Sequence, residues 1–244
     1  MNGNDIEKVS KSLKDSKKVM VISGAGISAE SGVPTFRGKD GLWRNYNAME
    51  LATPEAFASD PKLVWEWYNW RRELISKCSP NPAHTTLTEI EKSKDNFLLV
   101  TQNVDGLHRI AGSKNVVEIH GNIWHMRCTR EGKVTENSQV PIDPLPPMCE
   151  CGAMMRPHIV WFGEMLPMEE FGRADHFLGT GNLDIMLVIG TSALFPYIQG
   201  WAYAGRQMGA LVVEINLDPS PISEFADISL LGKAGEIMPK IWNK

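Results

Sequence analysis

Short apolar runs alternate with longer amphipathic stretches along most of the chain. Runs with the length and composition of buried strands are Lys18–Ser23, Phe97–Thr101, Val116–Ile119, Asp184–Gly190 and Leu211–Asn216. The spacing of apolar residues predicts helices at about residues 4–15, 60–77, 83–93, 167–180, 197–208 and 234–242. Because a run such as Ile185–Ile189 is apolar at every position, both faces of these strands should be covered. The alternation predicts an α/β fold built on a doubly wound parallel sheet.

Two segments interrupt this alternation. From about Trp124 to Met155 the chain has prolines at 141, 144, 146 and 147, three cysteines and little helical periodicity. This segment predicts a small inserted module, with the main sheet resuming near Pro157. A second insertion is expected between Pro34 and about Cys78. We therefore expect a large domain of about residues 16–33, 80–122 and 157–244, and a smaller domain of about residues 34–79 and 123–156.

Composition narrows the class of protein. The chain has 244 residues and 43% hydrophobic content, enough for a core without disulfides. Its 25 basic and 29 acidic residues argue against a polybasic nucleic-acid-binding protein. No apolar run reaches the length of a membrane span, and the first residues lack the pattern of a signal peptide. We expect a cytoplasmic protein with no nucleic-acid or membrane partner, and its cysteines to be thiols or metal ligands.

A glycine-rich loop follows the first predicted strand. Gly24, Ala25 and Gly26 are followed by Ile27, Ser28 and Ala29, which fits a loop that cradles a dinucleotide pyrophosphate; a plain glycine turn is the alternative. A dehydrogenase would need a second strand with an acidic residue about 20 positions later, but that region has the composition of a loop. The pattern thus favours a dinucleotide without hydride transfer. Phe36 and Arg37 would lie near it, unless Arg37 is only a solvated charge.

Polar residues follow the other predicted strands. Gln102, Asn103 and Asp105 come after the second strand, His120 closes the third, and Gly190, Thr191, Ser192 and Asn216 end two more. In open α/β sheets, ligands bind beyond the carboxyl ends of the strands, so these residues should meet at one edge. His120 is the candidate general base, with a structural histidine as the alternative. The histidines at 84, 125, 158 and 176 are expected on the surface or in packing, and His108 is expected to support its loop.

From about Lys18 to its end, the chain resembles the sirtuin family of NAD-dependent protein-lysine deacylases. The segments that carry the resemblance are Gly24–Gly38 (GAGISAESGVPTFRG), Thr101–His108 (TQNVDGLH), His120-Gly121, Val160–Glu164 (VWFGE), Gly190–Ser192 and Asn216. The resemblance implies a Rossmann-like large domain and a smaller domain with a zinc module. NAD and the acylated lysine of a protein substrate would enter the cleft between them from opposite sides.

The resemblance also implies roles for individual residues. The NAD phosphates would lie on Gly24, Ala25 and Gly26, with Gly190, Thr191 and Ser192 nearby. Nicotinamide and its ribose would be surrounded by Ser28, Gln102, Asn103 and Asp105. Asn216, Lys233 and Ala234 would approach the adenosine end, and Val160, Trp161, Phe162 and Gly163 would pair with the substrate backbone. His120 would take a proton from a ribose hydroxyl, and the products would be nicotinamide, O-acyl-ADP-ribose and free lysine.

The predicted helix at 60–77 contains a possible acyl-binding pair. Tyr68 and Arg71 are three residues apart and share one helix face, where an arginine and a phenol can bind a carboxylate. The alternative is an aromatic helix packed on the core, with Arg71 or Arg72 solvated. Sirtuins that remove succinyl and malonyl groups carry the same Tyr-x-x-Arg spacing and an upstream alanine, here Ala52. The resemblance therefore implies that Tyr68 and Arg71 hold a distal carboxylate and that Ala52 leaves room for it.

The cysteines match a zinc module only in part. Cys128 is followed by Glu131 where a second cysteine is expected, and Cys149 and Cys151 are closer together than the usual pair. Cys78 is expected to lie elsewhere. This incomplete pattern predicts a module stiffened by prolines that has lost zinc. The alternative is a site completed by Glu131, or by Cys149 in a shifted geometry.

The leading functional prediction is an NAD-dependent protein-lysine deacylase that favours acidic acyl groups and also removes acetyl. The alternatives are an enzyme that is mainly a deacetylase, a mono-ADP-ribosyltransferase, and a non-catalytic NAD sensor. His120, Asn103 and Asp105 argue against the sensor, because binding alone does not need them.

Overall fold

A parallel sheet lies at the centre of the larger part of the molecule. The computed structural model describes residues 3–35 and 48–243. In these ranges six parallel strands pair in the order β3-β2-β1-β7-β8-β9. Their bounds are β1 Lys18–Ser23, β2 Asn96–Thr101, β3 Val116–Glu118, β7 Ile185–Ile189, β8 Leu211–Asn216 and β9 Ile228–Leu231. The order is that of a Rossmann fold and changes direction between β1 and β7, so the predicted fold class is confirmed.

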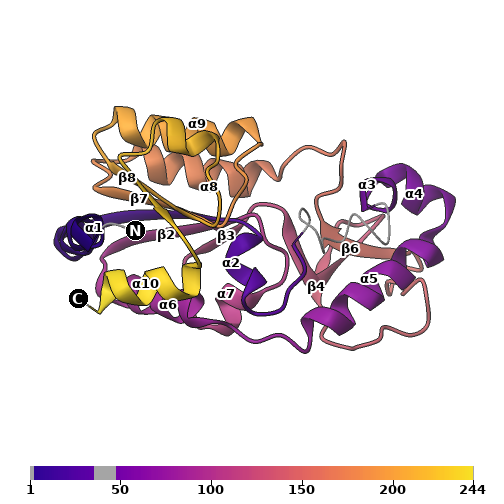
Figure 1. The fold of residues 1–244 in the computed structure, drawn as a ribbon. Helices are drawn as coiled ribbons and strands as arrows, with labels where there is room; N and C mark the ends of the chain where they lie inside the picture. Colours follow the sequence, from indigo (N-terminus) through magenta and orange to yellow (C-terminus); the bar gives the residue numbers. More distant parts are fainter. Residues whose placement is uncertain (1–2, 36–47, 244) are drawn as a thin grey trace.

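Helices cover both faces of this sheet (Figure 1). The helices on one face are α1 Gly3–Asp15, α6 Pro82–Ser93 and α10 Ala234–Trp242, and those on the other are α8 Met168–Gly179 and α9 Pro196–Gln207. Every residue of β1 and β7 is buried, as their uninterrupted apolar sequences predict. The edge strand β9 was not predicted, because its buried and exposed positions alternate over only four residues.

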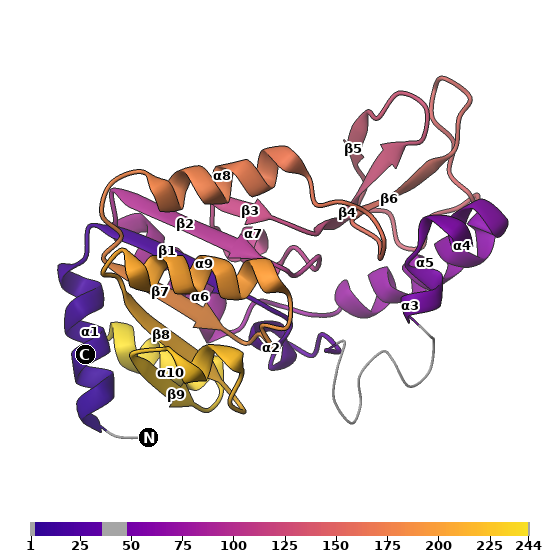
Figure 2. The same ribbon diagram turned by 90° about the horizontal axis from the view of Figure 1, so that it is seen from above.

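The smaller part of the molecule lies beside the sheet and is formed by both insertions (Figure 2). Its antiparallel sheet has the order β5-β4-β6. The strands are β4 Gly121–Cys128, β5 Val134–Glu136 and β6 Met155–Ile159, and the helices from the first insertion are α3 Ala48–Leu51, α4 Pro54–Ser59 and α5 Pro61–Ile75. The expectation that the main sheet resumes near Pro157 is wrong: β6 pairs with β4, and the main sheet resumes at β7. The sequence of β6, MRPHI, lacks the apolar continuity of a central strand.

The two insertions share one hydrophobic core. Trp65 on α5 is buried and donates from its indole N–H to the backbone oxygen of Met155 on β6, at 2.9 Å. Phe57 on α4 packs against Trp161, with ring centroids 5.3 Å apart. The first insertion therefore brings helix α5 against the strands of the second, beside the carboxyl ends of the main sheet.

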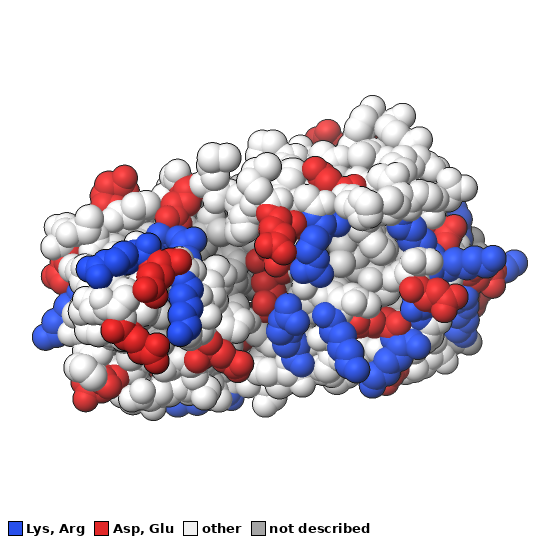
Figure 3. Space-filling view, turned by 180° about the vertical axis from the view of Figure 1, so that it is seen from behind, with Lys and Arg blue, Asp and Glu red and all other residues white. Residues whose placement is uncertain are grey.

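The surface carries charges of both signs. On the face shown in Figure 3, acidic side chains lie among the basic ones, in keeping with the formal net charge of −4. Within the described ranges, no helix has both the length and the apolar sequence needed to cross a bilayer.

Candidate functional site at the carboxyl ends of the strands

The glycine loop lies where the strand order changes direction. The backbone N–H of Gly26 donates to the oxygen of Gly190 at 2.8 Å, which joins the loops after β1 and β7. A Cβ on Gly26 would lie 2.8 Å from the Cα of Gly190, and Gly190 itself has φ +61°. Only glycine fits so close a contact between two backbones. The following helix α2, Gly26–Ala29, has four residues, so the loop backbone rather than a helix dipole shapes this part of the site.

Polar residues after β2 reach the glycine loop. The amide nitrogen of Asn103 donates to the oxygen of Gly24 and to the hydroxyl of Ser28, both at 3.1 Å. Asp105 is 3% exposed and accepts from the backbone N–H of Leu107 at 2.9 Å. Burial raises the pKa of Asp105, while its hydrogen bonds to Leu107 and Ser28 oppose that shift. The predicted nicotinamide residues thus form one buried polar cluster beside the loop.

His120 joins this cluster through Gln102. The Nδ1 atom of His120 lies 3.0 Å from the backbone oxygen of Gln102, and the side chain of Gln102 donates to Thr191 Oγ1 at 2.9 Å. A carbonyl oxygen can only accept, so Nδ1 carries the proton and Nε2 holds a lone pair in the neutral ring. Burial lowers the pKa of His120, which keeps the imidazole neutral. The arrangement is suited to a general base.

A cavity extends from the glycine loop toward β8 and β9. It has a volume of about 300 Å³, within the range of small-molecule sites. The residues that line it are Gly26, Ala29, Glu30, Gly190, Ile215, Asn216, Leu217, Gly232, Lys233 and Ala234. The side chain of Asn216 donates to the oxygen of Thr191 at 2.8 Å, which links this cavity to the polar cluster. The structure thus brings together the residues predicted for the phosphate and adenosine ends.

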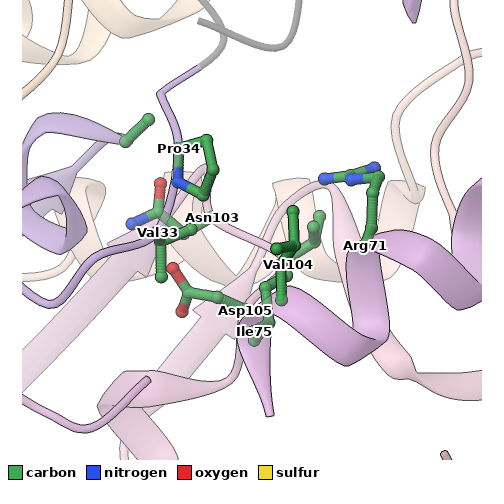
Figure 4. A pocket seen from close by; sticks show the side chains of 9 residues that line it. Val33, Pro34, Arg71, Ile75, Asn103, Val104 and Asp105 are labelled. Atoms are coloured by element: carbon green, nitrogen blue, oxygen red, sulfur yellow. The ribbon is translucent and has the colours of Figure 1, made fainter. Parts of the chain in front are cut away.

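Helix α5 lines a pocket on the other side of the glycine loop. Arg71 approaches this pocket from α5, while Pro34, Asn103 and Asp105 lie across it (Figure 4). Arg71 is 5% exposed, and its guanidinium carbon lies 5.0 Å from the ring centre of Trp67 and 5.4 Å from that of Tyr68. A positive charge is therefore buried at the boundary between the two parts of the molecule.

The aromatic residues of α5 are packed in the core, as the alternative held, but neither of its arginines is solvated, so that part of the alternative is wrong. Arg72 is fully buried, and its guanidinium donates to the backbone oxygens of Ile123 and Asn137, both at 2.5 Å. Arg72 therefore holds strand β4 and the loop after β5 onto α5. Arg71, one position earlier on the helix, faces the pocket instead.

The other predicted acyl-binding residues lie around Tyr68. The indole N–H of Trp161 donates to the Tyr68 hydroxyl at 2.9 Å, and Arg71 also hydrogen-bonds to Tyr68. The oxygen of Tyr68 thus accepts these bonds, and its O–H remains a potential donor. The backbone N–H of Phe162 donates to the oxygen of Ala52 at 2.9 Å. The contacts connect Ala52 and Phe162, through the adjacent Trp161, to Tyr68 and Arg71, and of these residues Arg71 lines the pocket.

The segment predicted to pair with substrate is hydrogen-bonded to its own surroundings in this structure. The N–H of Val160 donates to the oxygen of His120 at 2.9 Å, which ties this segment to the general base. Beyond Trp161, Phe162 and Gly163 are exposed. Whether a peptide pairs here remains a prediction.

Four potential metal ligands converge in the small domain. The Sγ atoms of Cys128, Cys149 and Cys151 and a carboxylate oxygen of Glu131 all lie within 4.8 Å of one another. Cys128 Sγ is 3.5 Å from Cys151 Sγ, and Cys149 Sγ is 3.9 Å from Glu131 Oε2. Tetrahedral zinc with Zn–S bonds of about 2.3 Å spaces its ligands by roughly 3.8 Å. The donor set fits zinc, which favours the alternative over the predicted loss of the metal.

The pKa of Cys128 also fits zinc binding. The backbone N–H of Glu131 donates to Cys128 Sγ at 3.4 Å and lowers the pKa of Cys128 to about 7. Zinc binds the thiolate form, so this shift favours binding. Cys78 lies outside the cluster, as expected.

Some residues lie beyond what the sequence predicted or the structure describes. Phe36 and Arg37 fall outside the described residues. Glu30, which was not predicted, accepts from the N–H of Gly235 at 2.9 Å and anchors α10 to the glycine loop. Tyr197, also not predicted, contacts His120. It lies at the start of a predicted helix, and nothing in its local sequence indicates that contact.

Comparisons with known proteins agree with this geometry. A family model described as the Sir2 family matches residues 24–195. A protein of Pyrococcus furiosus named NAD-dependent protein deacylase is 50% identical over 240 residues, which cover 96% of this chain and 95% of the relative. One of the same name from Aquifex aeolicus is 46% identical over 226 residues, covering 92% of this chain and 94% of the relative.

Solved structures of the same family superpose closely. A structure described as a Sir2 homolog–NAD complex is 44% identical and has a TM-score of 0.89, covering 96% of this chain and 91% of the other. A second structure, described as addressing the mechanism and regulation of Sir2 enzymes, is 33% identical and has a TM-score of 0.84. The match covers 99% of this chain and 98% of the other. With the family match over most of its length, the chain belongs to the Sir2 family of enzymes, the sirtuins.

Proposed function

We propose that this protein is an NAD-dependent protein-lysine deacylase. The observation that carries the proposal is the cluster of Ser28, Asn103 and Asp105 beside His120, at the point where the strand order changes direction. A binding protein would not need a neutral histidine with a lone pair there. The names of the relatives from Pyrococcus furiosus and Aquifex aeolicus support the same activity.

The chemistry follows from where these residues lie. NAD supplies the ribose carbon that receives the acyl oxygen, and nicotinamide leaves. Ser28, Asn103 and Asp105 would bind the nicotinamide amide, which has both a donor and an acceptor. His120 would accept a proton at Nε2 from a ribose hydroxyl, and that oxygen would attack the acyl carbon. Water then releases O-acyl-ADP-ribose and free lysine.

The acyl pocket favours an acidic acyl group. Arg71 is a buried cation that lines the pocket, and the proton of Tyr68 is available to an acceptor. A succinyl or malonyl carboxylate would accept from both, as a charge-assisted pair in a site of low dielectric. The small side chain of Ala52, next to Phe162, leaves room for the longer chain.

A panel of succinyl-, malonyl- and acetyl-lysine peptides with NAD tests both proposals. We expect nicotinamide release that depends strictly on peptide, with kcat/KM higher for the acidic acyl groups. In Arg71→Met the ratio of succinyl to acetyl kcat/KM should fall about 10- to 150-fold, because a charged hydrogen bond of roughly 1.5–3 kcal/mol is lost. Arg71→Lys, which keeps the charge but not the fork, should fall between the two.

The other outcomes identify the alternatives. An unchanged ratio in Arg71→Met would indicate an enzyme that is mainly a deacetylase. Nicotinamide release without peptide, with label transferred to protein, would indicate a mono-ADP-ribosyltransferase. No turnover with any peptide would indicate an NAD sensor.

The small domain is proposed to hold a structural zinc ion. Cys128, Cys149, Cys151 and Glu131 would be its ligands, since a carboxylate oxygen can replace a thiolate at zinc. Cys128 is the last residue of β4, and Cys149 and Cys151 precede β6. Zinc there would hold together the ends of two paired strands, β4 and β6.

A further inference from the structure

The catalytic histidine has a second partner, Tyr197. The hydroxyl of Tyr197 lies 2.6 Å from Nε2 of His120. Because Nδ1 donates to the oxygen of Gln102, Nε2 of the neutral ring is an acceptor and the tyrosine must be the donor. The lone pair that the proposed reaction needs is therefore occupied by a side chain of this protein.

Packing fixes the position of the Tyr197 ring. It stacks on Phe195, with centroids 5.6 Å apart and planes at 18°, and its edges meet Phe171 and Trp201 at 6.3 Å and 5.5 Å. The indole of Trp201 is itself held by Asp175, at 2.6 Å. Tyr197 also lies close to the start of α9, directly after the loop that begins at Gly190. The contact with His120 is thus built into the fold.

We propose that Tyr197 is a positioning residue for His120: its hydroxyl keeps Nε2 unprotonated and oriented until a ribose hydroxyl takes over that acceptor. The proposal rests on the proposed function, in which His120 is the general base. In this scheme Tyr197 contacts neither NAD nor the acylated lysine and acts only through the histidine.

The surroundings of the hydroxyl set the direction of its effect. The neighbouring rings of Phe195, Phe171 and Trp201 offer its proton no acceptor comparable with Nε2. A hydrogen bond donated to the neutral imidazole stabilises that form and opposes its protonation. Burial also raises the pKa of Tyr197, so the phenol stays protonated and remains a donor.

Charged groups on β3 and α8, the elements that neighbour the two residues of this contact, are paired. Glu118, at the end of β3, lies 3.1 Å from Arg109, and Glu170 on α8 lies 3.1 Å from Arg173. The main-chain oxygen of Gln102 is the partner from the end of β2. None of these contacts involves Tyr197, so a change at Tyr197 leaves them in place.

Tyr197→Phe removes only the hydroxyl and tests the proposal. In the variant, the pKa of His120, followed by NMR of histidine-labelled protein, should rise by about 0.5–1 unit, the equivalent of one hydrogen bond. The acid limb of kcat/KM for deacylation should move to higher pH by the same amount. Tyr203→Phe is the matched control, because Tyr203 lies on the same helix, is 54% exposed and contacts Phe225 instead.

A pKa of His120 that is unchanged or lower in Tyr197→Phe would overturn the proposal. If that variant does not fold, the unsubstituted chain labelled with fluorotyrosine gives the second measurement. Fluorination strengthens the phenol as a donor, so the pKa of His120 should fall, and an unchanged value would again contradict the proposal. If the unsubstituted protein shows no turnover, the deacylase assignment fails, while the NMR titration still decides the role of Tyr197.

Discussion

Trp161 and Tyr68 join the substrate-side segment to helix α5 through one buried hydrogen bond. The indole N–H of Trp161 donates to the Tyr68 hydroxyl at 2.9 Å, and these side chains are 2% and 0% exposed. Arg156 also packs over the indole ring of Trp161, with its guanidinium carbon 3.5 Å from the ring centre. Any change at Tyr68 therefore affects stability and the acyl pocket together.

Tyr68→Phe should separate these two effects. The change leaves the indole N–H of Trp161 buried without its acceptor, so the free energy of unfolding should fall by about 1–3 kcal/mol. The ratio of succinyl to acetyl kcat/KM should fall as well, because the donor to the distal carboxylate is lost. Urea unfolding and the peptide panel measure the two. Loss of stability with an unchanged ratio would show that Tyr68 has no part in selecting the acyl group.

Protein purified without chelator should contain about one zinc ion per chain. Glu131→Ala should lower zinc affinity more than the 10–100-fold typical of a residue that only supports a ligand, as measured by competition with a chelating dye. Cys78→Ser is the matched control, because Cys78 lies outside the cluster of ligands. Equal zinc content in Glu131→Ala and Cys78→Ser would remove Glu131 from the ligand set.

Gly26→Ala should weaken both the fold and NAD binding. The new Cβ would lie 2.8 Å from the Cα and the oxygen of Gly190. The loops that carry Gly26 and Gly190 are joined by a backbone hydrogen bond, so neither can shift alone. We expect a loss of about 1–3 kcal/mol, as for overpacking elsewhere. In Gly172→Ala, on the exposed side of α8, the Cβ meets nothing within 4 Å, so alanine should stabilise by roughly 0.5–1 kcal/mol. Similar unfolding free energies for the two variants would contradict this account.

Stability should fall between about pH 6.5 and pH 4. Burial lowers the pKa of His84 to about 4, and that of His108 also lies well below its ordinary value. The unfolded chain, in which histidine titrates near 6.5, then binds more protons than the folded chain across this interval. Stability is fully present above pH 6.5. The contribution of His84 that is lost on acidification is about 3 kcal/mol.

The Nδ1 atom of His84 accepts from the backbone N–H of Asn81 at the start of α6, and protonation would remove that acceptor. Glutamine does not titrate. In His84→Gln the slope of the unfolding free energy against pH should therefore decrease by the amount that corresponds to about one bound proton. Urea unfolding across the interval measures it. An identical slope in the variant would assign the acid sensitivity to other groups.

Much of this protein was determined by local sequence. Uninterrupted apolar runs predict buried parallel strands, because a strand covered on both faces needs apolar residues at every position. Polar residues directly after those runs were correctly expected at one edge, since parallel strands share their carboxyl ends. Gly24, Asn103, His120 and Asn216 therefore come together as the pattern indicated.

Other features were decided only by tertiary contacts between distant segments. The strand β6 could not be predicted, because its partner β4 rather than its own apolar pattern stabilises it. The spacing left Glu131 as one alternative ligand, and only the folding back of the chain brings it to Cys149 and Cys151. Tyr197 and His120 are 77 residues apart, and packing around α9 alone brings the phenol to the imidazole. Sequence periodicity reports which face of an element is buried, whereas these contacts depend on which elements meet.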